Sequence, residues 1–365
     1  MPDRQAQPRG AGRRHVYIEA LRILACLAVI WNHTPRSGYF LFTTREPGSF
    51  LFYLELCLSI GCKFASPLFF AISGALLLGR EISLRELWTK RIPRLVCTLA
   101  VFSLISYGIR LAAGKDVLDI KGFLFRAYDD NHNYAYWFLY AYVAFLIALP
   151  LLDALVRSLS DRRLAYLLGI AFLFKSLLPA IEQMRWGGAH QLNPFVTDTW
   201  LTSDILVYPV IGYALHRRMS LAGARRLLPW LCAASAVGLM ISCQLTLREY
   251  YHTWNLFIQT YHTLFAGVYC ATVFAGFRCL CAHAAPDGRP ARITRALGSC
   301  TLGVYLLHVP IMDHTVFFQK TFWIPFDQLH VPQLLSGFLY CVTLMLFCAA
   351  ITAVLKRIPG LRRLL

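Results

Sequence analysis

Ten apolar segments, each close to or above the length needed to cross a bilayer, follow one another along this 365-residue chain. To within several residues, they cover 16–36, 50–79, 92–112, 134–156, 163–182, 200–216, 228–247, 257–280, 295–314 and 333–355. A membrane-spanning helix needs about 20 mostly apolar residues, and it satisfies its own backbone hydrogen bonds in lipid. The sequence therefore predicts an all-α, polytopic membrane protein with about ten transmembrane helices. Pro209 and Pro310 interrupt the sixth and ninth segments, which makes these two the least regular.

The distribution of charge orients the predicted helices. The chain is 57% hydrophobic and only 15% charged, yet its formal net charge is +17. With the N-terminus in the cytoplasm, the inner segments carry 24 Lys and Arg residues and the outer loops carry eight. This bias follows the positive-inside rule, so both termini are predicted to be cytoplasmic. The basic charge is then a topology signal, and no nucleic-acid partner is expected.

The segments group into one membrane domain at residues 16–357, between a basic cytoplasmic tail at 1–15 and a short basic tail at 358–365. Arg13 and Arg14 precede an apolar run, as they would in a secretory signal. However, Trp-Asn-His-Thr-Pro follows Ile30, where a small-residue cleavage site would stand. The first segment is therefore expected to be retained, in a multi-pass protein of the inner (cytoplasmic) membrane.

This orientation can be tested by labelling single cysteines introduced into the loops, in intact cells. The expected outcome is that a membrane-impermeant maleimide labels the outer positions and not the inner ones, because the basic inner loops stay in the cytoplasm. The outer positions are Ser37, Asp130 and Gly187, and the inner ones are Ser83, Ser160 and Ser220. Labelling of Ser83 and Ser220 from outside would overturn the orientation.

The chain lacks the short motifs of several enzyme classes. No Walker, GxSxG, HExxH or GxGxxG sequence occurs. Its twelve cysteines lie mostly inside apolar segments without CxxC or Cys/His ligand spacing, so neither a disulfide framework nor a metal site is predicted. No tightly bound cofactor is expected. Any chemistry must come from the ionisable side chains inside the apolar segments.

The first apolar segment places ionisable side chains on one helical face. Arg22 and His33 are eleven positions apart, which returns a helix to within about 20° of its starting direction and separates them by about 16 Å. Glu19 lies three residues before Arg22, within reach of an ion pair. Ionisable groups in hydrocarbon are costly and mark functional sites. The alternative is that Arg22 snorkels to the headgroups while His33 lies at the opposite interface.

The second segment contains a lysine followed by a proline and small residues. Lys63 is expected near mid-bilayer, where an ammonium group is costly unless it faces water or an anion. Pro67 is expected to kink the helix. Ser73 and Gly74 allow a neighbouring helix to approach closely, which packing alone also explains.

A basic cluster stands at the predicted cytoplasmic mouth of the third segment. Lys90, Arg91 and Arg94 lie within five residues. Arginines at such an entrance can bind phosphates through charge and bidentate hydrogen bonds. They can equally anchor the helix by contacting anionic lipid headgroups. The residues alone leave both interpretations open.

Aromatic residues and a second histidine lie towards the outer ends of later segments. Trp137 and Tyr140 belong to a Tyr-Trp-Phe-Leu-Tyr run, a composition that an interfacial aromatic belt also explains. Tyr305 precedes His308 in the ninth segment. Taken alone, His308 is more typical of a hydrogen-bonded structural residue than of a catalytic one.

Together these motifs resemble those of acyltransferase family 3, a family of integral membrane acyltransferases, and especially its stand-alone bacterial O-acetyltransferase members. The resemblance covers nearly the whole chain. It rests on Arg-x10-His at 22–33, PLFFAISG at 67–74, Lys-Arg-x-Pro-Arg at 90–94, Tyr-Trp-Phe-Leu-Tyr at 136–140 and Thr-Leu-Gly-Val-Tyr-Leu-Leu-His at 301–308. It implies a ten-helix enzyme that moves an acyl group, usually acetyl, from cytoplasmic acyl-CoA to a hydroxyl. The acceptor would be a cell-envelope glycan, a lipid-linked sugar or a small metabolite.

The resemblance also implies roles for the candidate residues. His33 is expected to act as the general base on the acceptor hydroxyl. Arg22, held by Glu19, is expected to orient the donor or to stabilise the negative charge that develops on the thioester oxygen. The candidates for binding acyl-CoA are Lys63, Lys90, Arg91 and Arg94. The candidates for binding the acceptor are Trp137, Tyr140, Tyr305 and His308. Direct transfer and an acyl-enzyme intermediate both remain open.

Two other functions fit parts of the same pattern. Many spans, broken helices and buried charges are also typical of a transporter or flippase for a lipid-linked or small polar substrate. The two halves of the chain show no convincing internal repeat, which counts against this alternative. The second is an inactive membrane partner with the same fold, against which the presence of both Arg22 and His33 argues.

Overall fold

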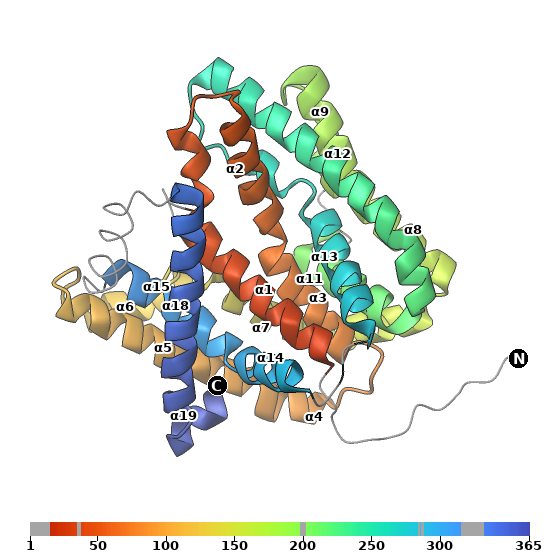
Figure 1. The fold of residues 1–365 in the computed structure, drawn as a ribbon. Helices are drawn as coiled ribbons and strands as arrows, with labels where there is room; N and C mark the ends of the chain where they lie inside the picture. The colour runs from red at the N-terminus through yellow and green to blue at the C-terminus, as the bar shows by residue number, and fades with distance from the viewer. Residues whose placement is uncertain (1–14, 35–37, 198–201, 284, 286–287, 315–331) are drawn as a thin grey trace, which may run out of the picture.

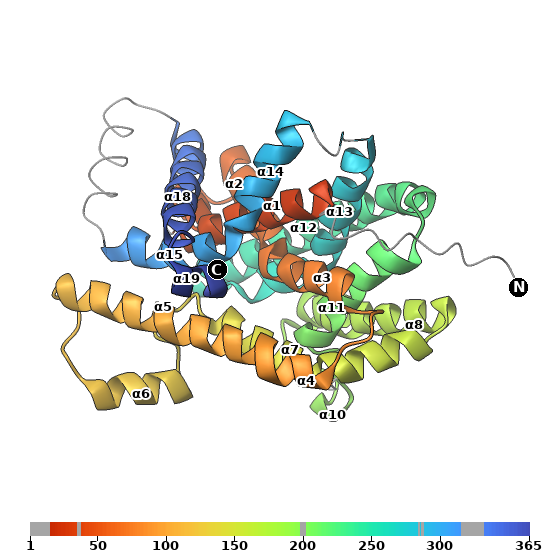
Figure 2. The same cartoon turned by 90° about the horizontal axis from the view of Figure 1, so that it is seen from below.

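The computed structural model describes residues 15–34, 38–197, 202–283, 285, 288–314 and 332–365, and every regular element in them is a helix (Figures 1 and 2). Among these residues, eight helices are long and apolar enough to cross a membrane, or nine if one bent pair counts as a single span. The chain is therefore a polytopic helical membrane protein. The predicted class is confirmed, while the number of full-length spans is lower than the ten that the sequence predicts.

Most predicted segments coincide with long helices. The bounds are α1 Val16–His33, α2 Phe50–Gly61, α3 Ala65–Leu77, α5 Ile92–Ala112, α7 Trp137–Ser158, α8 Asp161–Phe172, α9 Leu178–Trp186, α12 Leu221–Thr253, α13 Ala266–Leu280 and α18 Gln333–Leu355. Shorter helices are α4 Leu84–Glu86, α6 Ile120–Asp129, α10 Pro194–Thr197, α11 Asp204–Tyr213, α14 Arg289–Ser299, α15 Thr301–His314 and α19 Pro359–Leu364. Helices α2 with α3, and α8 with α9, each continue across one turn of different helical geometry.

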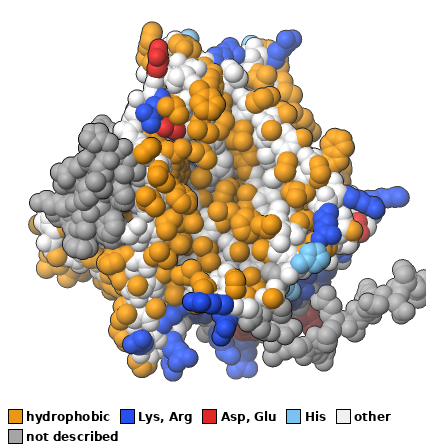
Figure 3. Space-filling model, viewed as in Figure 1, with side chains coloured by type: hydrophobic (Ala, Val, Ile, Leu, Met, Phe, Trp, Pro, Cys, Tyr) orange, Lys and Arg blue, Asp and Glu red, His pale blue; other side chains and the backbone are white. Residues whose placement is uncertain are grey.

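The outer surface has the composition expected of a membrane protein. Figure 3 shows apolar side chains across the middle of the face in view, with most Lys and Arg side chains near its edges. Large apolar residues such as Leu151, Trp230 and Met240 are exposed on the long helices. In water, so much exposed apolar area would drive association, whereas in lipid it is the solvated surface.

The predicted sixth span does not form a helix long enough to cross a bilayer. Helix α11 and the π-helical turn Ala214–Arg218 that continues it cover this segment, and neither is long enough to cross a bilayer. Instead α11 packs along α3 more extensively than any other pair of described helices. A helix shielded by its neighbours need not span the full hydrocarbon thickness, because it does not have to meet lipid along its length.

Glycines set the distance between α3 and α11. A Cβ on Gly74 would lie 1.9 Å from the Pro209 carbonyl oxygen, and one on Gly212 would lie 1.8 Å from the Ala71 carbonyl oxygen. No side chain fits at either position, so the two backbones touch as in small-residue crossings of membrane helices. The close approach expected at Gly74 is confirmed.

One span changes its helical geometry and another is bent, each at a different place from the one expected. The second span changes to a 3₁₀ turn at Cys62–Phe64, before Pro67, which lies in the first turn of α3. Proline is tolerated in a first turn because the N–H it lacks has no helical acceptor there. The ninth span bends by 56° between α14 and α15, near Cys300, whereas Pro310 lies inside α15. The predicted breaks at Pro67 and Pro310 were therefore wrong.

Helix α1 lies inside the bundle and carries the candidate residues. It packs against α3, α13, α14, α15 and α18 (Figure 1). Helices α5 and α7 pack against each other, and α15 also packs on α5. In Figure 2, α5 and α6 lie on one side of the molecule, with α1 and α18 across from them. The space between α1, α3, α5, α7 and α15 is where the polar residues converge.

Candidate functional site

Arg22 and Glu19 form the predicted ion pair on α1. The Arg22 guanidinium donates to Glu19 Oε1 at 2.8 Å, and Glu19 is 1% exposed. A Cβ on Gly298 would lie 2.3 Å from Glu19 Oε2, so the missing side chain in α14 makes room for the carboxylate. A buried carboxylate needs a partner. Glu19 and Arg22 therefore hold each other in place at the wall of a cavity.

That inner cavity, of about 450 Å³, lies at the end of α1 predicted to face the cytoplasm. Arg22, Arg91 and Arg94 all line it, together with Tyr142 and Ser73, whose hydroxyls are 3.0 Å apart. Three guanidinium groups at one cavity create a site for anions. In the sequence, the rest of α1 and the span formed by α2 and α3 lie between Arg22 and the other two arginines. The fold brings all three to one cavity.

The two entrance arginines have modest partners of their own. Arg91 pairs with Glu86 at 3.0 Å, and both side chains are more than a third exposed. Arg94 donates to the Leu364 carbonyl at 3.4 Å, and Leu364 also lines the cavity. Exposed pairs of this kind are weak, so an incoming phosphate can replace them. Lys90 is exposed and is not among the residues that line this cavity.

A second, outer cavity of about 400 Å³ contains the histidine. His33, Lys63 and Trp137 line it, and so does Asn32, whose amide donates to the Cys62 carbonyl at 3.0 Å. The Asn32 Oδ1 atom is buried without a hydrogen-bond partner among the described residues. Asn32 thus lines the cavity beside His33, which helical rotation does not predict, because adjacent residues of a helix point about 100° apart.

Among the described residues, one belongs to both cavities. Tyr305 on α15 lines the inner and the outer cavity, and its hydroxyl donates to the Ala135 carbonyl. On α3 the neighbouring residues divide, with Phe69 on the inner cavity and Phe70 on the outer one. The Arg22 and His33 cavities therefore meet at Tyr305 and lie at different levels along α3, where Ser66 and Phe70 line the outer cavity and Ser73 and Leu77 line the inner one.

His308 lies behind His33 and is fully buried. Its Nδ1 is 2.7 Å from the Tyr305 carbonyl, and its Nε2 is 2.8 Å from His33 Nδ1. A carbonyl only accepts, so Nδ1 of His308 carries the proton, and in the neutral ring Nε2 accepts. This network assigns the proton of His33 to Nδ1 and leaves its Nε2 with a free lone pair. His308 lines neither cavity, so the structure places it behind His33 and not at the wall of the outer cavity.

Lys63 occupies the 3₁₀ turn between α2 and α3. Its ammonium lies 3.8 Å from the centre of the Tyr39 ring, a cation–π contact. The Tyr39 hydroxyl is hydrogen-bonded to Nδ1 of the buried His262, whose Nε2 is 3.1 Å from the Thr246 hydroxyl. The lysine is thereby aimed at the outer cavity, away from the inner one where acyl-CoA binding was expected.

The aromatic candidates for acceptor binding do not all line the same cavity. Trp137, at the start of α7, lines the outer cavity. Tyr140 lines neither cavity, and its hydroxyl donates to the Ala127 carbonyl in α6 at 3.1 Å. Of the four aromatic and histidine candidates for the acceptor, the fold brings Trp137 and Tyr305 to the outer cavity.

The sequence interpretation also missed a charged pair beside the outer cavity. Asp204, the first residue of α11, lines this cavity and accepts from Lys175 at 2.6 Å. Lys175 stands alone inside the fifth apolar segment. A lone charge in an apolar run is itself a functional signal, and it could have been selected on that ground.

The chain matches a known protein family. A family model described as "Acyltransferase domain" matches residues 15–353. No curated protein and no solved structure gave a match to the chain. The matched range includes both cavities and every residue named in them except the two C-terminal leucines of the inner wall. The chain therefore belongs to acyltransferase family 3 and is a membrane acyltransferase.

Proposed function

We propose that this acyltransferase moves an acyl group, acetyl first of all, from acyl-CoA in the inner cavity to a hydroxyl in the outer cavity, with His33 as the general base. The acceptor class is a glycan of the cell envelope or its lipid-linked precursor, and the enzyme would lie in the inner membrane. The observation that carries the proposal is the pair of cavities, one lined by Arg22 and one by His33, that meet at Tyr305.

The lining of the inner cavity is suited to binding the acyl-CoA donor. Coenzyme A is a long anion with phosphates at one end and the thioester at the other. Arg91 and Arg94 stand at the start of α5, where they can hold phosphates, and Arg22 lies deeper, near Tyr305. Guanidinium groups bind phosphate oxygens through paired, charge-assisted hydrogen bonds. The pantetheine arm would then run between α3, α5 and α7 towards Tyr305.

In the outer cavity, His33 is positioned to act as the general base. The Nε2 of His33 takes the proton of the acceptor hydroxyl as its oxygen attacks the thioester carbonyl carbon. The carbon–sulfur bond breaks as the tetrahedral intermediate collapses, and the imidazolium returns the proton to the leaving sulfur. The products are the acyl ester and free coenzyme A. His308 is a positioning residue, since it fixes the tautomer that exposes Nε2.

Two cations can stabilise the negative charge that develops on the thioester oxygen. Arg22 approaches from the donor side and Lys63 from the acceptor side. A fixed cation in a water-poor site stabilises such charge more strongly than one in bulk water. Glu19 keeps the guanidinium oriented. Tyr305, between them, bounds the point where carbonyl and hydroxyl meet.

Transfer can be measured directly in purified protein. Protein in lipid nanodiscs is incubated with radiolabelled acetyl-CoA, and release of free coenzyme A is followed with and without extracts of envelope lipids. We expect release that depends on His33, and mass spectrometry of cells with and without the gene should show acetyl esters that appear only with it. Folded protein that neither binds nor consumes any acyl-CoA contradicts the proposal.

The role of the entrance arginines has its own test. Replacing both Arg91 and Arg94 with glutamine is expected to weaken acyl-CoA binding at least about tenfold, because each charged contact is worth about 1.5–3 kcal/mol. Binding is measured by titrating acyl-CoA into the folded variant. The matched control is Arg225→Gln with Arg226→Gln at the start of α12, which removes the same charge and leaves the cavity intact. Equal affinity in both double variants, with lower membrane yield of the first, would mean that Arg91 and Arg94 are topology anchors.

A further inference from the structure

A further cavity, of about 420 Å³, adjoins the outer cavity beside α9, towards the end of this helix that is predicted to face outward. We call it the polar cavity. Asp204, Tyr208 and Thr263 line both this space and the outer cavity. Because His33 lines the outer cavity, a molecule that occupies both spaces can bring a hydroxyl to the imidazole. The polar cavity can therefore select the acceptor by a group that does not itself react.

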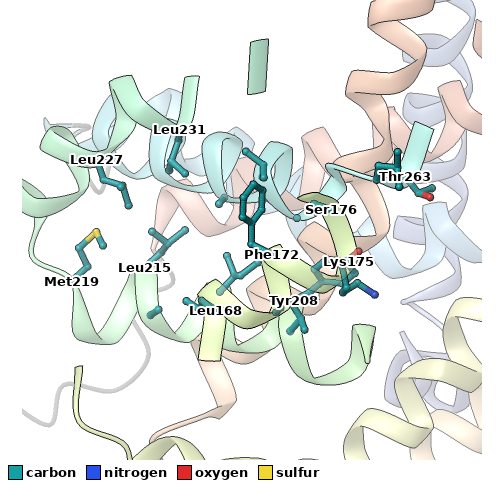
Figure 4. A pocket seen from close by; sticks show the side chains of 18 residues that line it. Leu168, Phe172, Lys175, Ser176, Tyr208, Leu215, Met219, Leu227, Leu231 and Thr263 are labelled. Carbon is teal, nitrogen blue, oxygen red and sulfur yellow. The ribbon is translucent and has the colours of Figure 1, made fainter. Parts of the chain in front are cut away.

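An apolar cavity of about 270 Å³ borders the same region, between α8, α11, α12 and α13 (Figure 4). Figure 4 shows Met219 and Leu227 at one end of it and Lys175 and Tyr208 at the other, with the Lys175 ammonium turned away from the apolar side chains. Charged groups are not stabilised by such walls. A charged group of an acceptor therefore fits the polar cavity and not the apolar one.

Two carboxylates and one ammonium line the polar cavity. They belong to Glu182, Asp204 and Lys175. The Lys175 ammonium lies 2.6 Å from Asp204, so these two groups neutralise each other. Glu182 is the third charge, and it gives the cavity wall a net negative charge.

Glu182 has no cation of its own among the described residues. Its side chain lies on α9 and is 7% exposed. One carboxylate oxygen accepts from the Leu192 N–H at 2.7 Å, and no Lys, Arg or His in the described part of the chain forms an ion pair with this carboxylate. A buried carboxylate without a counter-charge is costly. The missing cation is therefore expected to come from a ligand.

The lining favours an ammonium group over a metal ion. In the described ranges, no group of three or more His, Cys, Asp or Glu side chains could hold a metal, whereas Mg²⁺ and Ca²⁺ take at least about six oxygen ligands. An ammonium needs hydrogen-bond acceptors for three N–H groups. Besides the Glu182 carboxylate, the Gln191 amide and the Thr197 hydroxyl line the cavity and offer neutral oxygens.

We propose that the acceptor carries a free ammonium group, which binds Glu182 in the polar cavity while a neighbouring hydroxyl reaches His33. The proposal rests on the function proposed above and specifies its substrate class as hydroxyl-bearing amines, such as amino sugars. A protonated amine has no lone pair with which to attack the thioester. Glu182 thus also directs the acyl group to oxygen and away from nitrogen.

Binding can be tested without any acyl donor. The full-length protein in nanodiscs is titrated with glucosamine, galactosamine and mannosamine, each compared with its N-acetyl derivative, by saturation-transfer NMR in a buffer that keeps the amines protonated. At least one amino sugar is expected to bind at least about tenfold more tightly than its N-acetyl derivative, because only the ammonium makes a charged hydrogen bond to Glu182. If none of the three pairs shows this difference, the proposal is wrong.

Glu182→Gln isolates the charge, because the glutamine amide oxygen can still accept from the Leu192 N–H. In this variant the preference for the amino sugar is expected to disappear, while the N-acetyl derivative binds as before. The matched control is Glu46→Gln, which removes an exposed carboxylate outside the polar and outer cavities and keeps the full preference. If Glu182→Gln keeps the preference and only Glu182→Ala alters binding, Glu182 has a structural role and the proposal is overturned.

The position of the acyl group is tested with acetyl-CoA and the preferred amino sugar. The reaction is stopped in acid, which keeps the amine protonated, and the product is treated with hydroxylamine. Hydroxylamine is expected to release the acetyl group, because it cleaves an ester and leaves an amide intact. An acetyl group on nitrogen contradicts the proposed role of Glu182.

Failure of this inference can be separated from failure of the proposed function. The titrations report sugar binding alone, whereas His33-dependent release of coenzyme A reports the transfer. If that release is equal with amino sugars and with their N-acetyl derivatives, the function stands and the ammonium site is wrong. If amino sugars bind through Glu182 but no acyl-CoA is consumed, the ammonium site stands and the acyl transfer is wrong.

Discussion

Replacing His33 with alanine is expected to lower the turnover number about 10²- to 10⁴-fold, the range for loss of a general base. Acyl-CoA affinity should stay near its native value, because His33 lines the outer cavity and the arginines line the inner one. Single-turnover rates with radiolabelled acetyl-CoA, and equilibrium titration of the donor, measure the two quantities separately. The native rate should fall as the pH drops through the pKa of the imidazole, because only the neutral ring can accept the proton.

Two controls accompany this experiment. Trp230, which is exposed on α12 and lines neither the inner nor the outer cavity, can be replaced with alanine to show the effect of an unrelated loss of side chain. His308→Gln tests the positioning role, since it should alter the pH profile of the rate more than donor affinity. If folded His33→Ala protein transfers acyl groups at a near-native rate, the base lies elsewhere, and His308 is the next candidate.

Replacing Arg22 with alanine is expected to lower both donor affinity and turnover, because its guanidinium lines the donor cavity and faces the developing oxyanion in the proposed mechanism. The combined loss in kcat/KM should exceed about 100-fold, since removal of one such electrostatic donor alone costs about 10²–10³ in rate. Arg22→Lys should recover only part of it, because an ammonium lacks the planar fork of the guanidinium. Rates and titrations in nanodiscs measure each effect.

The ion pair complicates this test and also supplies its control. Arg22→Ala leaves the buried Glu19 carboxylate without its cation, and breaking a buried pair costs about 3–5 kcal/mol of stability. In the double variant Arg22→Ala with Glu19→Gln, no net charge stays behind, so folding should recover while catalysis does not. Recovery of native donor affinity in this double variant would mean that Arg22 has only a structural role.

Local pattern predicted much of the fold and part of the site. Apolar segment length located α1, α5, α7, α12 and α18, because one helix crossing lipid must be apolar along its length. Helical periodicity placed Glu19 beside Arg22, a relation fixed within one turn. These are properties of single helices, which the sequence determines without reference to the rest of the chain.

Relations between distant segments could not be predicted in this way. The contact of His33 with His308 joins residues 275 positions apart, and no local periodicity encodes it. The break at Lys63 was assigned to Pro67, because proline signals a kink by itself whereas a 3₁₀ turn depends on packing. Lys175 was visible as a charge in an apolar segment, but its pairing with Asp204, 29 positions away, was not.

Tyr305 has a consequence for the membrane itself. Among the described residues it alone lines both the inner and the outer cavity, so the two cavities approach each other at its side chain. A protein hollowed from both sides must still prevent leakage of protons and ions down their gradients. The Tyr305 hydroxyl donates to the Ala135 carbonyl and Phe138 packs against the ring, so this side chain is held in place between the two cavities. In the proposed transfer, a thioester and a hydroxyl would meet beside this ring without either carrier molecule crossing the bilayer.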